Sequence, residues 1–151
     1  MKTYKSEMPM LSIKYKASGM KKVQLKNSND AFTVLKEMYD SDTLEYSEST
    51  IIIFLNRSNN TIGWTRHTSG GTASTIMDVK MILSEALLCG ASGIMFSHNH
   101  PSSNLLASRE DINMTKKLSE ACKIMDISLI DHIIIAGDQS GYYSFADEGQ
   151  L

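Results

Sequence analysis

The chain has 151 residues, of which 42% are hydrophobic and 21% charged, and its net charge is −2. This composition is typical of a globular domain, and the length suits one domain with its own hydrophobic core. The longest apolar runs, such as Ile51–Leu55, fall far short of the ~18 residues that indicate a membrane span. No apolar run follows the N-terminal residues, and the two cysteines, Cys89 and Cys122, are not spaced as metal ligands. We therefore expect a cytoplasmic protein with reduced thiols.

Positive charge gathers at the start of the chain. Residues 1–26 carry seven lysines and one acid, so this segment has a net charge of +6 and the remainder −8. Such an arm can contact nucleic acid or an acidic partner. It has no arginine and only two aromatic side chains, Tyr4 and Tyr15, so it is more typical of a solvated, poorly packed segment. We divide the chain into a basic N-terminal extension, residues 1–26, and one domain, residues 27–151.

The first half of the chain predicts one helix and a strand hairpin. Leu11–Lys16 alternates apolar and polar residues, which favours an edge strand. Residues 27–30 offer N-caps for a helix to about Met38, with a buried stripe of Ala31, Val34, Leu35 and Met38. The β-branched run Ser49–Leu55 predicts a central strand that is apolar on both faces. Residues 61–67 return as its hairpin partner.

The second half alternates helices with strands. Gly70–Gly71 breaks the hairpin strand, and a helix follows over 77–89, with apolar Ile82, Leu83, Ala86 and Leu87 and a stop at Gly90. A strand over 92–97 comes next, and a second helix runs from an N-cap at Ser108 to about Met125. The last two predicted strands cover 127–136 and 142–145. Helices between strands indicate a helix-covered sheet, and the hairpin adds antiparallel pairing. The predicted fold class is α/β (α+β), with a mixed sheet flanked by helices.

The most informative segment follows the strand at residues 92–97. His98 and His100 are two residues apart at a strand end, so their side chains point to the same side. Pro101 turns the chain out of the strand and keeps the pair at the rim of the sheet. Asp111, in the first turn of the next helix, can return a carboxylate over the strand end. Two nitrogens and one oxygen around an open fourth position form the usual ligand set of a hydrolytic zinc site.

Each of these residues also has an ordinary structural explanation. A histidine near a strand end is commonly structural, and Ser108 and Asp111 have the spacing of a capping box. The two roles are compatible, because Ser108 can cap the helix while Asp111 turns to a metal. Glu48, at the mouth of the Ser49–Leu55 strand, could take a proton from water. The residues alone do not distinguish Glu48 from Glu45.

Together these residues resemble the JAMM (MPN-plus, or JAB) metalloprotease motif. That motif has an upstream Glu, then H-x-H-P-S, then S-x-x-D, and here Glu48, residues 98–102, Ser108 and Asp111 fill it. Within the superfamily the chain is most similar to the bacterial RadC family, over about residues 28–151. Its ending, residues 141–149, resembles short RadC-like proteins often found on mobile elements, which are forms without a helix-hairpin-helix region.

The resemblance implies a JAB-type fold, related to cytidine deaminases, with one Zn²⁺ per chain. It implies His98, His100 and Asp111 as the protein ligands, with water as the fourth. Glu48 would be the general acid/base, and Ser108 would donate a hydrogen bond to the developing oxyanion. Either of two neighbouring residues, Asp131 and His132, could orient a ligand or simply form a polar strand end.

The implied function is a zinc-dependent hydrolase that cleaves a peptide or isopeptide-like bond in an unidentified substrate. The chain departs from the family at Ser103 and Ala107, where Gly and Pro are usual, and at Val79-Lys80, where Pro-Arg is frequent. No motif ligand is lost. One alternative is a non-enzymatic accessory protein of DNA repair or of mobile elements, which binds DNA through residues 1–26 or binds a protein partner. Another alternative is an interaction domain that zinc stabilises and that catalyses no reaction. The sequence leaves the oligomeric state open.

Overall fold

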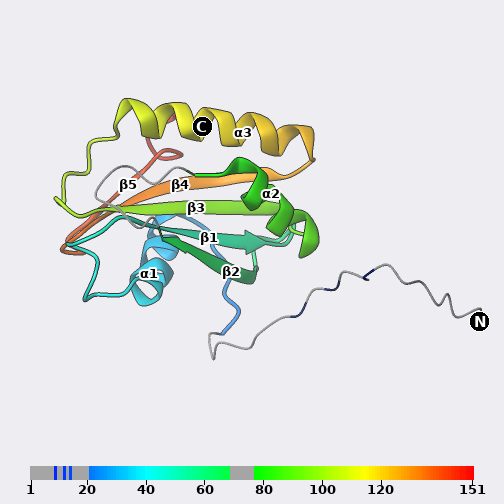
Figure 1. The fold of residues 1–151 in the computed structure, drawn as a ribbon, viewed down its shortest axis with the longest axis horizontal. Coiled ribbons are helices and arrows are strands. Elements are labelled where there is room, and N and C mark those ends of the chain that lie inside the picture. Colours follow the sequence, from blue (N-terminus) through cyan, green and yellow to red (C-terminus); the bar gives the residue numbers. More distant parts are fainter. Residues whose placement is uncertain (1–8, 10–11, 13, 15–20, 69–76) are drawn as a thin grey trace, which may run out of the picture.

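The computed structural model describes residues 9, 12, 14, 21–68 and 77–151 (Figure 1). The elements, in order, are α1 (Ser28–Met38), β1 (Ser49–Leu55), β2 (Thr61–Thr68), α2 (Val79–Leu88), β3 (Gly93–His100), α3 (Arg109–Ile124), β4 (Ser128–Ala136) and β5 (Tyr142–Ser144). The predicted edge strand over Leu11–Lys16, apart from Ser12 and Lys14, and the predicted break at Gly70–Gly71 lie outside the described residues.

The strands form one mixed sheet in the order β2-β1-β3-β4-β5. The β3–β4 pair is parallel, and the other three pairs are antiparallel. Figure 1 shows α1 against one face of the sheet, with α2 and α3 on the other. The parallel pair needs a crossover, and α3 supplies it. The predicted mixed sheet flanked by helices is confirmed.

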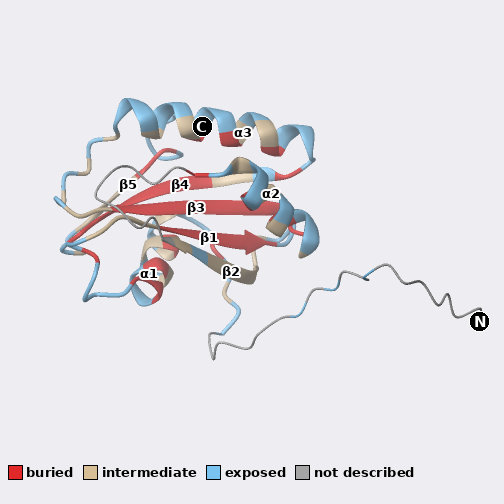
Figure 2. Ribbon diagram, in the orientation of Figure 1, coloured by how far each residue is buried: buried red, intermediate tan, exposed pale blue. Residues whose placement is uncertain are grey.

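The strands β1 and β3 are buried over nearly their whole length and are red in Figure 2, whereas β2 at the edge is only partly buried. In β1, alternate side chains serve different cores, because successive residues of a strand point to opposite sides. Ile51 and Ile53 pack in the core that contains α1, whereas Ile52 and Phe54 pack in the core beneath α2 and α3. This double burial explains why the β1 sequence is continuously apolar.

α1 and α3 begin at capping residues that the sequence offered. Asn27 caps α1 by accepting a hydrogen bond from the Asp30 N–H at 2.9 Å. Asp78 caps α2, which therefore starts two residues later than predicted. Ile82 and Ala86 form the buried face of α2, whereas Leu87, one of the four apolar residues noted in this helix, is 49% exposed. Leu87 follows Ala86 by one residue, about 100° further around the helix.

β3 is longer than predicted and includes both histidines. His98 pairs with Thr50 of β1 on one side and with Ile134 of β4 on the other, and His100 pairs with Ala136. The strand ends at Pro101, which has no N–H for a further ladder bond. The histidine pair is thus held in the ladder of the sheet's central strand.

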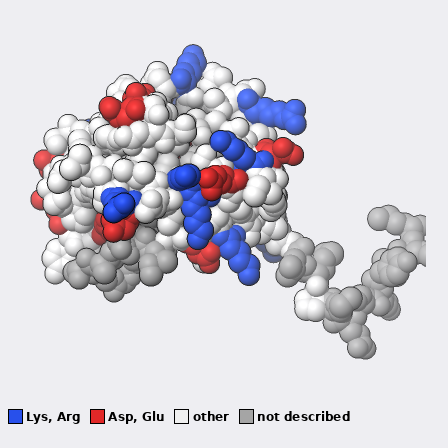
Figure 3. All heavy atoms as spheres, turned by 90° about the horizontal axis from the view of Figure 1, so that it is seen from above, with Lys and Arg blue, Asp and Glu red and all other residues white. Residues whose placement is uncertain are grey.

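The end of the basic N-terminal segment contacts the β1–β2 hairpin. Leu25 is buried, and its N–H donates to the Asn59 carbonyl oxygen at 2.9 Å. On the face seen in Figure 3, the described Lys and Arg side chains are interspersed with Asp and Glu and form no continuous basic patch. None of the helices within the described ranges is long and apolar enough to cross a bilayer.

Gly137 provides a test of how closely the chain packs behind the histidine pair. Its N–H donates to the His100 carbonyl oxygen at 2.9 Å. A Cβ on Gly137 would lie 2.7 Å from the Pro101 carbonyl oxygen and 3.0 Å from that of His100, so the backbone would have to move. We expect Gly137→Ala to lower the free energy of unfolding by about 1–3 kcal/mol in urea denaturation.

Gly63→Ala is the matched control, because a Cβ there meets no atom within 4 Å. It should not destabilise the protein. Equal unfolding midpoints for the two variants would contradict the close packing behind His100.

Candidate metal centre

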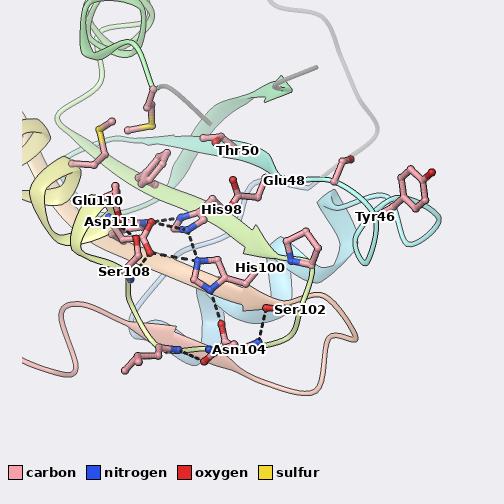
Figure 4. Close-up of a pocket in the computed structure, with 17 residues that line it drawn as sticks. Tyr46, Glu48, Thr50, His98, His100, Ser102, Asn104, Ser108, Glu110 and Asp111 are labelled. Carbon is pink, nitrogen blue, oxygen red and sulfur yellow. Dashed lines mark hydrogen bonds and ion pairs between the residues drawn. The ribbon is translucent and has the colours of Figure 1, made fainter. Parts of the chain in front are cut away.

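The structure brings the five predicted site residues together in one pocket (Figure 4). The pocket lies where the N-terminal end of β1, the C-terminal end of β3 and the first turn of α3 meet. The residues that converge on it are Glu48, His98, His100, Ser108 and Asp111. The roles of these residues as metal ligands or catalytic groups remain predictions.

Three side chains approach one another closely. The Nε2 atoms of His98 and His100 are 3.0 Å apart. The Asp111 carboxylate reaches both, with Oδ1 at 3.1 Å from His98 Nε2 and Oδ2 at 3.4 Å from His100 Nε2. Atoms bound at ~2.0–2.1 Å to a tetrahedral ion lie roughly 3.3 Å from one another. The two histidines and Asp111 therefore have the spacing that such an ion requires.

Glu48 approaches the same histidines from β1. Its carboxylate and ring nitrogens of His98 and His100 all lie within 4.8 Å of one another. The antiparallel register explains this proximity, because Thr50 is opposite His98 and two further residues bring Glu48 opposite His100. Glu45 does not line the pocket. The register thus distinguishes the two glutamates, which the sequence could not do.

Asp111 serves in the helix cap and contacts the histidines at the same time. Ser108 Oγ accepts from the Asp111 N–H at 3.1 Å, and Asp111 Oδ2 accepts from the Ser108 N–H at 2.7 Å. The capping interpretation is confirmed, and it fixes the carboxylate beside the two imidazoles. Burial acts to raise the pKa of Asp111, but hydrogen bonds with His100 and His98 outweigh it and hold the pKa well below its ordinary value.

A buried chain of hydrogen bonds determines which nitrogen of His98 faces the pocket. Thr115 Oγ1 donates to the Asp111 carbonyl oxygen at 2.7 Å, so it must accept from His132 Nδ1, 2.5 Å away. Burial and the neighbouring His98 hold the pKa of His132 well below its ordinary value, so this ring is neutral and its Nε2 is an acceptor. His98 Nδ1, at 2.8 Å, then donates to His132. A neutral His98 ring thereby presents its Nε2 lone pair to the pocket.

His100 is oriented in the same sense by a backbone group. Its Nδ1 is 2.5 Å from the Asn104 carbonyl oxygen, which can only accept a hydrogen bond. Nδ1 therefore carries hydrogen, and a neutral ring presents its Nε2 lone pair beside that of His98. In the protonated ring, Nε2–H donates to Asp111, and this hydrogen bond raises the pKa of His100 while burial opposes the rise.

Of the two neighbours considered as orienting groups, His132 contacts a predicted ligand and Asp131 does not. Asp131 accepts hydrogen bonds from Ser144 Oγ at 2.6 Å and from the Ala146 N–H at 3.0 Å. Burial raises its pKa. Asp131 therefore joins β4 to the C-terminal turn, and His132, on the other face of β4, supports His98.

Thr115 and Asn104 were absent from the sequence-based prediction. Thr115 lies four residues after Asp111, one helical turn along the same face of α3, and that spacing was a usable signal. Asn104 contributes its backbone carbonyl oxygen to His100. No side-chain pattern could have revealed that contact.

The sequence model of the RadC-like JAB domain matches residues 25–150. The chain belongs to this family. A UPF0758 protein of Flavobacterium johnsoniae is 38% identical over 130 residues, which cover 86% of this chain and 55% of that protein. Another, from Aquifex aeolicus, is 34% identical over 141 residues, covering 93% of this chain and 58% of that protein. This RadC-like chain spans about half the length of the curated relatives that it matches.

Substitution of Thr115 tests the buried series of hydrogen bonds from Thr115 through His132 to His98. Thr115→Val keeps the shape of the side chain but leaves the His132 Nδ1–H without an acceptor, and we expect a loss of about 1–3 kcal/mol in the free energy of unfolding. Thr115→Ser retains the hydroxyl and should lose much less. Urea denaturation of both variants measures the difference, and equal losses would show that the hydroxyl does not satisfy His132.

Proposed function

We propose that this RadC-like domain is a zinc-dependent hydrolase that cleaves peptide or isopeptide-like bonds. The observation that carries the proposal is the convergence of His98, His100 and Asp111, with both imidazole Nε2 atoms and both carboxylate oxygens within 3.0–3.4 Å contacts. Glu48 and Ser108 border the same pocket. These residue types supply the ligands, the proton carrier and the hydrogen-bond donor that such a reaction needs.

The donor set fits zinc. Two neutral imidazole nitrogens and one carboxylate form a common protein ligand set for catalytic zinc, which leaves one position open. Asp111 is assigned as the third ligand because it contacts both Nε2 atoms directly. Glu48, approaching from the opposite strand, is assigned to proton transfer. When bound, zinc supplies Lewis acidity that makes water a nucleophile near neutral pH.

Separate residues of the chain carry out the proton transfer and the charge stabilisation that hydrolysis of the bond requires. Glu48 accepts a proton from the attacking water and delivers it to the nitrogen of the departing amine. Ser108 Oγ already accepts a hydrogen bond from the Asp111 N–H, so its own hydrogen can be donated to the carbonyl oxygen as negative charge develops there. His132 and the Asn104 carbonyl oxygen keep the two imidazoles in place during the reaction.

Metal analysis of purified protein tests the ligand assignment. We expect one zinc per chain in the unaltered protein and none in His100→Ala or Asp111→Asn. The first substitution removes an imidazole nitrogen ligand, and the second removes the negative charge of the carboxylate ligand. Asp111→Asn retains an oxygen for the helix cap, so its loss of zinc would not reflect unfolding of α3. His67→Ala, outside the pocket, is the control and should keep its zinc. Full zinc content in Asp111→Asn would remove Asp111 from the ligand set.

Substitution of Glu48 separates proton transfer from metal binding. Glu48→Gln preserves size but cannot carry a proton, so we expect hydrolysis to fall by roughly 10²–10⁴-fold with zinc content unchanged. Glu45→Gln, three residues away and outside the pocket, should hydrolyse normally. Peptides carrying a fluorophore and quencher, with peptide or isopeptide linkages, provide the assay. An unchanged rate in Glu48→Gln would refute this mechanism, and loss of zinc would make Glu48 a ligand.

A further inference from the structure

Asn99, between the two histidines, has no place in the reaction described above. It is fully buried and is directed away from the pocket that His98 and His100 line. Its Nδ2 donates to the carbonyl oxygens of Leu44 and Ser47 at 2.7 and 3.0 Å. Its Oδ1 accepts from the Ser49 N–H at 2.8 Å and from Ser49 Oγ at 3.3 Å. The amide thus uses both hydrogens and both lone pairs.

Two of these partners, Ser47 and Ser49, lie immediately on either side of Glu48. Asn99 holds the carbonyl group of the preceding residue, Ser47, and the N–H of the following residue, Ser49. A backbone fixed on both sides leaves Glu48 little freedom to move relative to β3. The same strand segment therefore presents the histidines on one face and secures the approaching glutamate from the other.

We propose that Asn99 is a positioning residue that sets the location of the Glu48 carboxylate relative to His98 and His100. Its effect on turnover rests on the proposed function, in which Glu48 carries the proton. Its effect on the backbone at residues 44–49 does not. A misplacement of about 1 Å at a reacting group can cost 10²-fold in rate.

The chemistry of the contact requires an amide. An aspartate of the same shape would lack both donors and would direct a negative charge at the Leu44 and Ser47 carbonyl oxygens. An alanine would leave those oxygens and the Ser49 N–H without the side-chain partner. Both substitutions should release the segment that carries Glu48 while leaving the histidine side chains on the far face of β3 unchanged.

Ser97 offers a matched control on the same strand. It is also fully buried, lies on the same face as Asn99 and is also adjacent to His98. Its hydroxyl is paired with the Tyr39 hydroxyl at 2.9 Å, with the α1 side of the core, and not with residues 44–49. Ser97→Ala therefore removes a buried hydrogen bond next to the histidines without touching the Glu48 segment.

The experiment compares the unaltered 151-residue chain with Asn99→Ala, Asn99→Asp and Ser97→Ala. Amide hydrogen exchange at residues 44–49, zinc content, and kcat and KM on a quenched peptide are measured for each. In Asn99→Ala, which removes the acceptor of the Ser49 N–H, we expect exchange of the Ser49 amide to rise roughly tenfold or more. In Asn99→Asp, which keeps that acceptor but loses the donors to Leu44 and Ser47, we expect faster exchange at the other amides of residues 44–49. We expect kcat to fall roughly 10–100-fold with KM and zinc content nearly unchanged. Ser97→Ala should change neither the exchange nor kcat.

Unchanged exchange at residues 44–49 in the Asn99 variants would overturn the proposal, as would an equal fall in kcat for Ser97→Ala. If Asn99→Ala does not fold, the isosteric Asn99→Asp provides the same comparison. If the unaltered protein binds zinc but cleaves no peptide, the proposed function fails. Exchange at residues 44–49 then decides alone whether Asn99 fixes the segment, so the two failures remain distinguishable.

Discussion

The antiparallel pairing of β1 with β3 is the constraint on which the site depends. It places Thr50 opposite His98, and so brings Glu48 to the strand end where the histidines lie. A shift by one residue would turn every side chain of β1 to the other face of the sheet. The apolar residues of β1 prevent such a shift, because they fill cores on both faces. The packing of Ile51 to Leu55 therefore determines the strand register and, through it, the position of Glu48.

The start of α3 provides a second fixed point. The Ser108–Asp111 capping box satisfies backbone groups that every helix leaves unpaired at its N-terminus. The Asp111 carboxylate also contacts both histidines. One side chain therefore caps the helix and places the third predicted donor beside the imidazoles. Thr115, one turn later, links that turn through His132 to His98.

Local sequence signals predicted most of this arrangement. Asn27, Ser108, the β1 apolar run and the His98–His100 spacing each indicated an element or a shared face correctly. The prediction failed where tertiary contacts decide. β3 continues through His100 because β1 pairs with it as far as His98 and β4 pairs with it as far as His100. The choice of Glu48 over Glu45 and the contacts of His100 with Asn104 needed the register and the loop path, which single-sequence patterns do not contain.

The two histidines of the central strand would meet the proposed zinc as donors that are already oriented. Their rings are oriented by His132 and by a backbone carbonyl, and Asp111 by a helix cap, so protein contacts rather than an ion hold the donors in place. Where a site is built in this way, little of the binding free energy is spent on ordering the chain. Binding of the proposed zinc would then not depend on folding of the chain, and selectivity among ions would come from ligand chemistry and geometry.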